Sequence, residues 1–231
     1  IRVTTGSSGV FSYLMWLFYF LPGLIFTSRF ALIIYNVKED YKTILVFSLA
    51  LITIVSAIGS GLAVLKSKNL RKILSNLILL IFTGNILNLL LYIVDYVNED
   101  GYRMLNYSGL SLMIISWLPL AVIFTLIENN TGSNDINGLR SILIKNKAVS
   151  AGFIISCISL IGIPAFAGFT HKNYYMSIIP KAFAGGLSNL TPLLSWAVIV
   201  SVAIYLGFFI AGIIRIIISG FTGKVDIYND K

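Results

Sequence analysis

Residues 161–175 read IGIPAFAGFTHKNYY, and they lie in one of the most apolar regions of the chain. The stretch nevertheless combines helix-disrupting residues with two ionisable side chains. Pro164 cannot donate a backbone hydrogen bond, and Gly162 and Gly168 weaken a helix through their conformational freedom. This combination predicts a helix that is broken near residues 164–169, directly before a histidine and a lysine.

The composition of the whole chain predicts a membrane protein. Of its 231 residues, 57% are hydrophobic and only 11% are charged, whereas a soluble domain carries about 25% charged residues. A water-soluble fold of this length cannot cover so much apolar surface. The predicted class is therefore an all-α polytopic membrane protein. Its single cysteine, Cys157, excludes a disulfide framework, and the opening IRVTTGSSGV lacks the pattern of a signal peptide.

Six segments are apolar and long enough to cross a bilayer, which takes about 20 residues per helix. Together they predict one membrane domain over residues 1–231, with short polar loops between the spans. The fifth segment is too long for one straight span, in agreement with a discontinuous helix. The predicted spans are residues 10–36, 43–65, 72–94, 104–127, 148–183 and 190–219.

The distribution of charge predicts the orientation of these spans. Eleven basic and four acidic residues flank the spans on the side of the N-terminus, against four basic and five acidic residues on the other. An excess of Lys and Arg marks the cytoplasmic or matrix side of a membrane protein. Both termini are therefore predicted on that side, and the basic net charge is explained by topology. Nucleic-acid binding is not indicated, because basic and aromatic residues share no soluble surface.

Lys172 is the most informative of the charges inside the predicted spans. An ionisable residue within a span is costly and usually marks a path for an ion or a substrate. Burial destabilises an ammonium, so a lysine beside a helix break can gain and lose a proton near neutral pH. His171 is its neighbour in such a relay, although adjacent helical residues point in different directions. Alternatively, the break is a surface loop and Lys172 extends into the lipid headgroups.

Other charges offer weaker candidates for proton transfer. Arg29 follows a second interruption at Pro22 and Gly23, and it either faces the bundle interior or reaches toward the membrane surface. Arg71 and Lys72 belong to the basic loop KSKNLRK. They either anchor this loop on the positive side or begin the third span and project inward.

The remaining polar and aromatic residues predict structural roles. Serine, threonine and asparagine within the spans are expected to hydrogen-bond between packed helices, and tryptophans to face lipid or the interface. The sequence has no metal-spaced cysteine or histidine pairs and no nucleotide-binding glycine motif, so no metal or cofactor is expected in this chain. The polar residues within the spans are Ser56, Ser60, Asn76, Thr83, Asn85, Asn88, Ser156 and Ser159, and the tryptophans are Trp16, Trp117 and Trp196.

Four motifs, in the same order along the chain, carry a resemblance to a known family. LAVLKSKNLRKILSN, SNDINGL, LIGIPAFAGFTHKNYY and VIVSVAIYLGFFIAGIIR resemble segments of the antiporter-like membrane subunits of NADH:quinone oxidoreductase, respiratory complex I. The chain is most similar to the subunit called 2 in mitochondria and N in bacteria. The resemblance covers about residues 10–220 and corresponds to the C-terminal half of such a subunit.

The resemblance implies a proton-translocating subunit of the membrane arm, built from the second of two inverted repeats. Lys172 matches the lysine of the family's second broken helix, and Arg71 and Lys72 match a basic pair with the two residue types exchanged. The implied partners are lipids and other membrane-arm subunits, including a separately encoded N-terminal half. The implied location is the inner mitochondrial membrane with both termini in the matrix, or alternatively a bacterial plasma membrane. No redox centre or catalytic group is expected in this chain.

Two departures from the family pattern keep other functions open. Gly23 stands where the family has a lysine, and LILLIF at residues 77–82 replaces a segment with a histidine. A structural subunit with a decayed proton path is therefore an alternative hypothesis. A secondary cation/proton antiporter is another, because the family that the chain resembles shares its fold with such antiporters.

Overall fold

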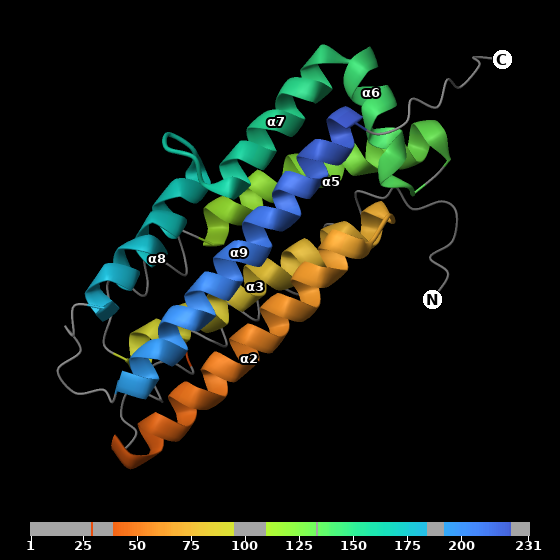
Figure 1. The fold of residues 1–231 in the computed structure, drawn as a ribbon. Helices are drawn as coiled ribbons and strands as arrows, with labels where there is room; N and C mark the ends of the chain where they lie inside the picture. Colours follow the sequence, from red (N-terminus) through yellow and green to blue (C-terminus); the bar gives the residue numbers. More distant parts are fainter. Residues whose placement is uncertain (1–28, 30–38, 95–109, 133, 184–191, 223–231) are drawn as a thin grey trace.

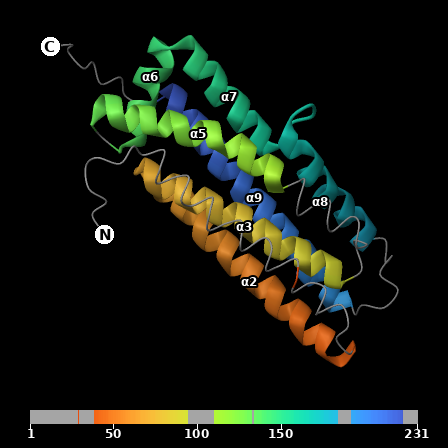
Figure 2. The ribbon, with the colours of Figure 1, turned by 180° about the vertical axis from the view of Figure 1, so that it is seen from behind.

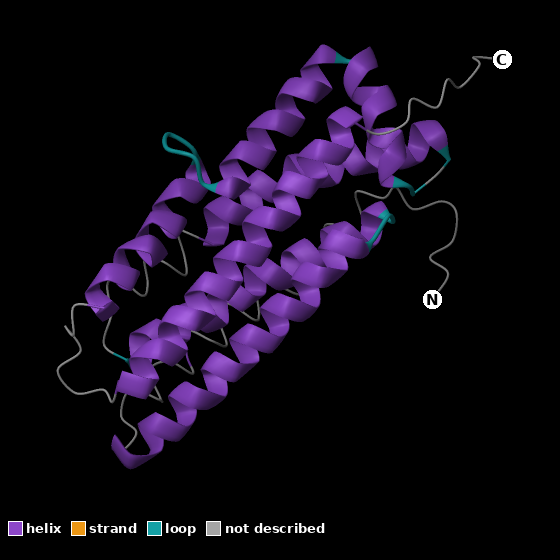
Figure 3. Ribbon diagram, in the orientation of Figure 1, coloured by secondary structure: helices purple, strands orange, loops and turns teal. Residues whose placement is uncertain are grey.

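The computed structural model describes residues 29, 39–94, 110–132, 134–183 and 192–222 of the chain. In these parts the secondary structure is helical, and strand geometry is limited to one isolated bridge between Asn69 and Asp135 (Figure 3). Pro22, Gly23 and nearly all of the first predicted span lie outside the described residues.

Four of the described helices are long and apolar enough to span a bilayer. They are α2 (Glu39–Lys66), α3 (Leu70–Ile93), α5 (Leu110–Thr131) and α9 (Pro192–Thr222). Their apolar stretches contain 18 to 29 residues, against a requirement of about 20. The chain is an all-α polytopic membrane protein, as its composition predicted.

The fifth predicted span consists of two shorter helices. Helix α7 (Lys147–Ile161) ends before the interruption and α8 (Ala167–Phe183) begins after it. The non-helical residues are therefore 162–166, and the prediction that the break reaches residue 169 is wrong. Gly168 lies inside α8, where its missing side chain allows close packing against α7, as described below.

Helix α9 holds the bundle together because it contacts α2 and α3 on one side and α6, α7 and α8 on the other. Figure 1 shows it running between these two groups, and Figure 2 shows α5 on the opposite face. Helix α3 is the most buried of the long helices. Its polar side chains therefore lie at the centre of the protein, where they can reach α8 and α9.

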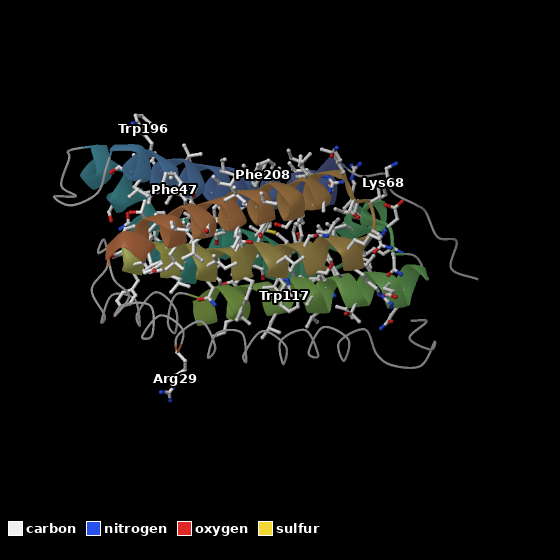
Figure 4. The ribbon with its side chains drawn as sticks, turned by 90° about the horizontal axis from the view of Figure 1, so that it is seen from below. Arg29, Phe47, Lys68, Trp117, Trp196 and Phe208 are labelled. Atoms are coloured by element: carbon white, nitrogen blue, oxygen red, sulfur yellow. The ribbon has the colours of Figure 1, made fainter. Side chains whose placement is uncertain are left out.

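The outer face of α2 exposes large apolar side chains, including Ile44, Leu51 and Val55. Such a surface is suited to lipid or to another membrane protein. Trp196 is also exposed, as expected, but Trp117 is only 1% exposed (Figure 4). The prediction that Trp117 faces lipid is wrong, because its indole is buried inside the helix bundle.

The basic residues of one membrane side gather at one end of the bundle. The turn between α2 and α3 is hydrogen-bonded to the loop after α5, from Leu70 N to Asn134 O (2.8 Å) and from Ile136 N to Lys68 O (2.9 Å). The short 3₁₀ helix η2 (Ile136–Gly138) and α6 (Leu139–Lys145) then lead into α7. Figure 4 labels Lys68 at this end and Trp196 at the other.

Arg215 connects α9 to the turn between α2 and α3 by hydrogen bonds. Its guanidinium donates to the carbonyls of Val64 and Ser67, the latter at 2.7 Å. Carbonyls at the C-terminal end of a helix have no partner within the helix, and a cation there is favoured by the helix dipole. Arg215 therefore caps α2 from a neighbouring helix.

Replacing Arg215 by methionine is expected to lower the unfolding free energy by about 2 kcal/mol, because charged hydrogen bonds to two carbonyls are lost. Thermal unfolding of the solubilised protein measures this change. Lys68→Met at the same end removes an exposed charge without these bonds, so it serves as the control. Equal unfolding temperatures for the two variants would contradict the capping role.

Most polar side chains within the spans bond to their own helix. Ser60 donates to Ser56 O, Thr83 to Leu79 O and Ser156 to Gly152 O. The prediction that these side chains join neighbouring helices is wrong, because a hydroxyl can reach the carbonyl four residues back without a partner helix. Among the described residues, the bonds Ser116–Ser159 and Tyr175–Asn88 do connect two helices.

Candidate functional site

The site begins where α7 ends inside the bundle. Asn146 caps the other end of this helix by accepting from the amides of Ala148 and Val149. After 15 residues, Gly162 adopts a left-handed conformation (φ 85°, ψ 44°) that an L side chain disfavours. A rise of 1.5 Å per residue places this end about 22 Å from Lys147. With Lys147 at the membrane surface, this end would lie within a hydrocarbon core of about 30 Å.

The last carbonyls of α7 have two kinds of partner. The amide of Gly162 donates to the carbonyls of Ile158 and Ser159, both at 3.1 Å. The carbonyls of Leu160 and Ile161 instead accept from Nζ of Lys172, with 3.0 Å to Ile161 O. The ammonium thus replaces the backbone amides that a continuous helix would have supplied.

Lys172 is only 5% exposed although it carries an ionisable amine. Its Nζ lies 4.1 Å from the centroid of the Phe209 ring on α9, a cation–π contact. The negative end of the α7 dipole also favours a cation at this position. The structure thus places the amine at the break and inside the bundle, which excludes a lysine extended into the headgroups.

Close packing of the two half-helices creates this arrangement. A Cβ built on Gly168 would collide with the carbonyl oxygen of Ser159, and one on Gly162 would lie 2.9 Å from Gly168 O and from Cδ of Lys172. Between them, Ala165 has a positive φ of 76°, which is uncommon for a residue with a side chain. Figure 3 shows the connecting loop bulging out beside the junction of α7 and α8.

Two groups of polar side chains flank the lysine. On the α5 side, the hydroxyls of Ser116 and Ser159 are 2.6 Å apart and buried. On the α3 side, Tyr175 donates to the carbonyl of Gly84 (3.0 Å) and to Oδ1 of Asn88. Tyr175 lies one helical turn after Lys172, so both side chains leave the same face of α8.

The other predicted site residues do not join Lys172. Arg71 is exposed and pairs with Glu128 of α5, with 3.0 Å between Nε and Oε2. Lys72 is exposed at the basic end. Arg29 is exposed as well, and its side chain points away from the bundle (Figure 4). His171 is part of α8, but its side chain lies outside the described residues. Inward projection of Arg71 and Lys72 is thus wrong, because Arg71 finds its carboxylate at the surface.

Sequence reasoning missed Tyr175, Tyr205 and Phe209. The spacing of Tyr175, three residues after Lys172, was an available signal for one shared face. Tyr205 and Phe209 on α9 gave no such signal, because an aromatic residue in an apolar span usually belongs to the core or faces lipid. The described residues contain no group of three His, Cys, Asp or Glu side chains that could hold a metal ion. The site offers an ammonium and hydroxyls, which carry exchangeable protons, and an amide and backbone carbonyls, which accept hydrogen bonds.

No family model matches this chain. Two curated relatives, both named NADH-quinone oxidoreductase subunit N, are similar to part of it. The one from Moorella thermoacetica is 30% identical over 153 residues, which are 58% of this chain and 31% of the relative. The one from Rickettsia bellii is 25% identical over 147 residues, which are 63% of this chain and 31% of the relative. The chain thus spans 31% of the length of these relatives, and its predicted similarity to subunit N is confirmed.

Proposed function

We propose that this chain is a membrane-arm subunit of NADH-quinone oxidoreductase and that it transfers protons through Lys172. The observation that supports this best is the buried ammonium at the junction of α7 and α8, in a chain similar to subunit N. Electron transfer from NADH to quinone takes place in other subunits. This chain contributes a proton site whose occupancy responds to their reaction.

The geometry suggests how Lys172 holds and releases a proton. In the charged form, the carbonyls of Leu160 and Ile161 and the face of Phe209 stabilise the ammonium, and no carboxylate among the described residues pairs with it. These neutral groups compensate only part of the hydration that burial removes, so the neutral amine is also accessible. A small movement of α8 relative to α7 would separate Nζ from the carbonyls. Such a movement lowers the affinity for the proton and lets it leave.

The break also supports assembly with other chains. Ile163, Pro164 and Ala165 form non-helical backbone and are exposed, although they follow the end of α7 at membrane depth. Exposure of irregular backbone to lipid is costly, so such segments lie against protein or a water-filled cavity. Other membrane-arm subunits, including a separately encoded N-terminal half, would cover this loop. The outer face of α2 is available for lipid.

The location follows from the same proposal. The basic end of the bundle faces the mitochondrial matrix or the bacterial cytoplasm, in accordance with the excess of positive residues there. Both termini lie on that side if all six predicted spans cross the membrane. The membrane is the mitochondrial inner membrane or a bacterial plasma membrane.

Purification of the native complex tests the assignment. An affinity tag on this chain, with extraction in a mild detergent, is expected to recover partner chains together with NADH:quinone reductase activity. Mass spectrometry of the partners should identify a chain with the N-terminal helices of subunit N. Recovery of this chain in a small assembly with ion-driven proton exchange and no NADH oxidation would favour a secondary antiporter instead.

A further inference from the structure

Helix α8 has an exposed face whose chemistry differs from that of the spanning helices. Figure 1 shows α8 at the edge of the bundle, where it packs against α7 and α9. Asn173, Met176 and Ser177 are exposed on α8, and their spacing of three and four residues places them on one side of the helix. We call these three residues the α8 face.

The contacts of neighbouring residues place the α8 face deep in the membrane. Nζ of Lys172 lies 4.1 Å from the ring centroid of Phe209, near the middle of the spanning helix α9. Tyr175 donates a hydrogen bond to the carbonyl of Gly84, near the middle of α3. Asn173 lies between Lys172 and Tyr175 in the same helix, within about 3 Å of both along its axis. Its amide is therefore far from both membrane surfaces.

Lipid offers no partner to an exposed amide at this depth. The side chain of Asn173 has two N–H donors and an acceptor oxygen, and it makes no hydrogen bond within the described part of the chain. The hydroxyl of Ser177, by contrast, donates to the carbonyl of Tyr174 (2.7 Å). Hydrocarbon cannot form hydrogen bonds, so polar side chains within a span face protein or water. The Asn173 amide therefore calls for a partner outside this chain.

The spanning helices present apolar side chains at comparable positions. Exposed residues near their middle include Val55 on α2, Val122 on α5 and Ala203 on α9, and hydrocarbon accommodates all three. On the α8 face, the apolar component is Met176, which is 55% exposed. A methionine side chain is flexible and adapts to differently shaped protein surfaces. An amide beside such a side chain is suited to contact with protein.

We propose that the α8 face binds a transmembrane helix of a different chain, which presents an asparagine, glutamine, serine or threonine to Asn173. Hydrogen bonds between such side chains are a common contact between helices in a membrane. The proposal rests on the proposed function, because a multi-subunit complex supplies the second chain. The two relatives named subunit N share only 31% of their length with this chain. A chain that corresponds to the rest of their length is the expected source of the helix.

A photoreactive diazirine amino acid in place of Met176 identifies what lies against the α8 face in the intact complex. Its carbene inserts into the nearest molecule, which is protein, lipid or water. The expected product is a covalent link to a different chain, in an apolar segment with an amide or hydroxyl side chain within one helical turn of the link. The same amino acid in place of Leu51, on the outer face of α2, should give mainly lipid adducts.

Three other products at position 176 would overturn the proposal. A link to a second copy of this chain would show self-association, lipid adducts would show an uncovered face, and addition of water would show a solvated cavity. The proposed function survives each of these outcomes if the tagged chain still recovers NADH:quinone reductase activity. Absence of that activity would overturn the proposed function, and with it the source of the partner helix.

Asn173→Leu tests the hydrogen bond of the amide. Leucine has a similar size but neither donates nor accepts, so the fraction of the chain cross-linked through position 176 is expected to fall about fivefold, the effect of one hydrogen bond between helices. Ser48→Leu is the matched control, because Ser48 is exposed on α2 and its hydroxyl bonds to Ile44 O in the same helix. This control should leave the cross-linked fraction unchanged. An unchanged fraction in Asn173→Leu would overturn the proposed contact.

Discussion

Replacement of Lys172 by methionine is expected to abolish proton transfer through this chain while the chain still assembles. Methionine keeps a similar length and fills the space beside Phe209, but it has no exchangeable proton. General acid–base groups contribute about 100-fold or more to proton-transfer rates. The loss should therefore be nearly complete for this path. It is measured as fewer protons moved per NADH oxidised in sealed vesicles.

Two further variants separate charge from proton exchange. Lys172→Arg keeps a cation for the carbonyls of Leu160 and Ile161, but a guanidinium does not release its proton in proteins, so it should fail like methionine. Lys68→Met removes an exposed lysine at the basic end and should leave the yield unchanged. Full yield in Lys172→Met, with normal amounts of assembled complex, would refute the role of this residue.

Gly168→Ala is expected to have the largest structural effect of any single methyl group added to the site. The new Cβ would lie 2.0 Å from the Ser159 carbonyl oxygen, so the first turn of α8 would be forced away from the last turn of α7. Overpacking of this kind costs about 3 kcal/mol or more when the obstacle is backbone. The displaced α8 would also carry Lys172 away from its carbonyl partners. The amount of this chain in the complex and the proton yield should both fall.

Gly152→Ala provides the matched control within α7. A Cβ there meets no atom within 4 Å, and alanine favours a helix over glycine by about 0.5–1 kcal/mol. Assembly and proton yield are therefore expected to stay at the unmodified level. Similar losses for both alanine variants would show that close approach at Gly168 is not what holds the two half-helices together.

Several elements of this site could be predicted because they depend on neighbouring residues. Gly162 and Pro164 predicted an interruption from their backbone chemistry alone, and Lys172 stood out as a charge in an apolar segment. The exact residues of the break could not be predicted. A glycine that ends a helix and a glycine that packs against one look the same in a sequence. Only the structure shows that Gly162 ends α7 and that Gly168 packs against the Ser159 carbonyl.

The side chains around Lys172 are brought together by contacts between distant segments. Tyr175 and Asn88 are separated by 87 positions, and the ring of Tyr205 packs against Tyr175 from a third helix. Each is unremarkable within its own span. The same holds for Trp117, whose burial results from the helices around it, and for Arg71, whose position was decided by Glu128 on another helix.

The sequence by itself determined that the chain is helical, that it lies in a membrane, and that one helix is interrupted beside a lysine. These properties follow from the total hydrophobicity of about 20 neighbouring residues and from the backbone chemistry of glycine and proline. Only the tertiary structure decided which side of each helix faces the interior. Lipid and the bundle core are both apolar, so the hydrophobic periodicity that marks the buried face of a soluble helix is weak in these spans. The partners of Lys172 and Tyr175 were therefore set by helix packing.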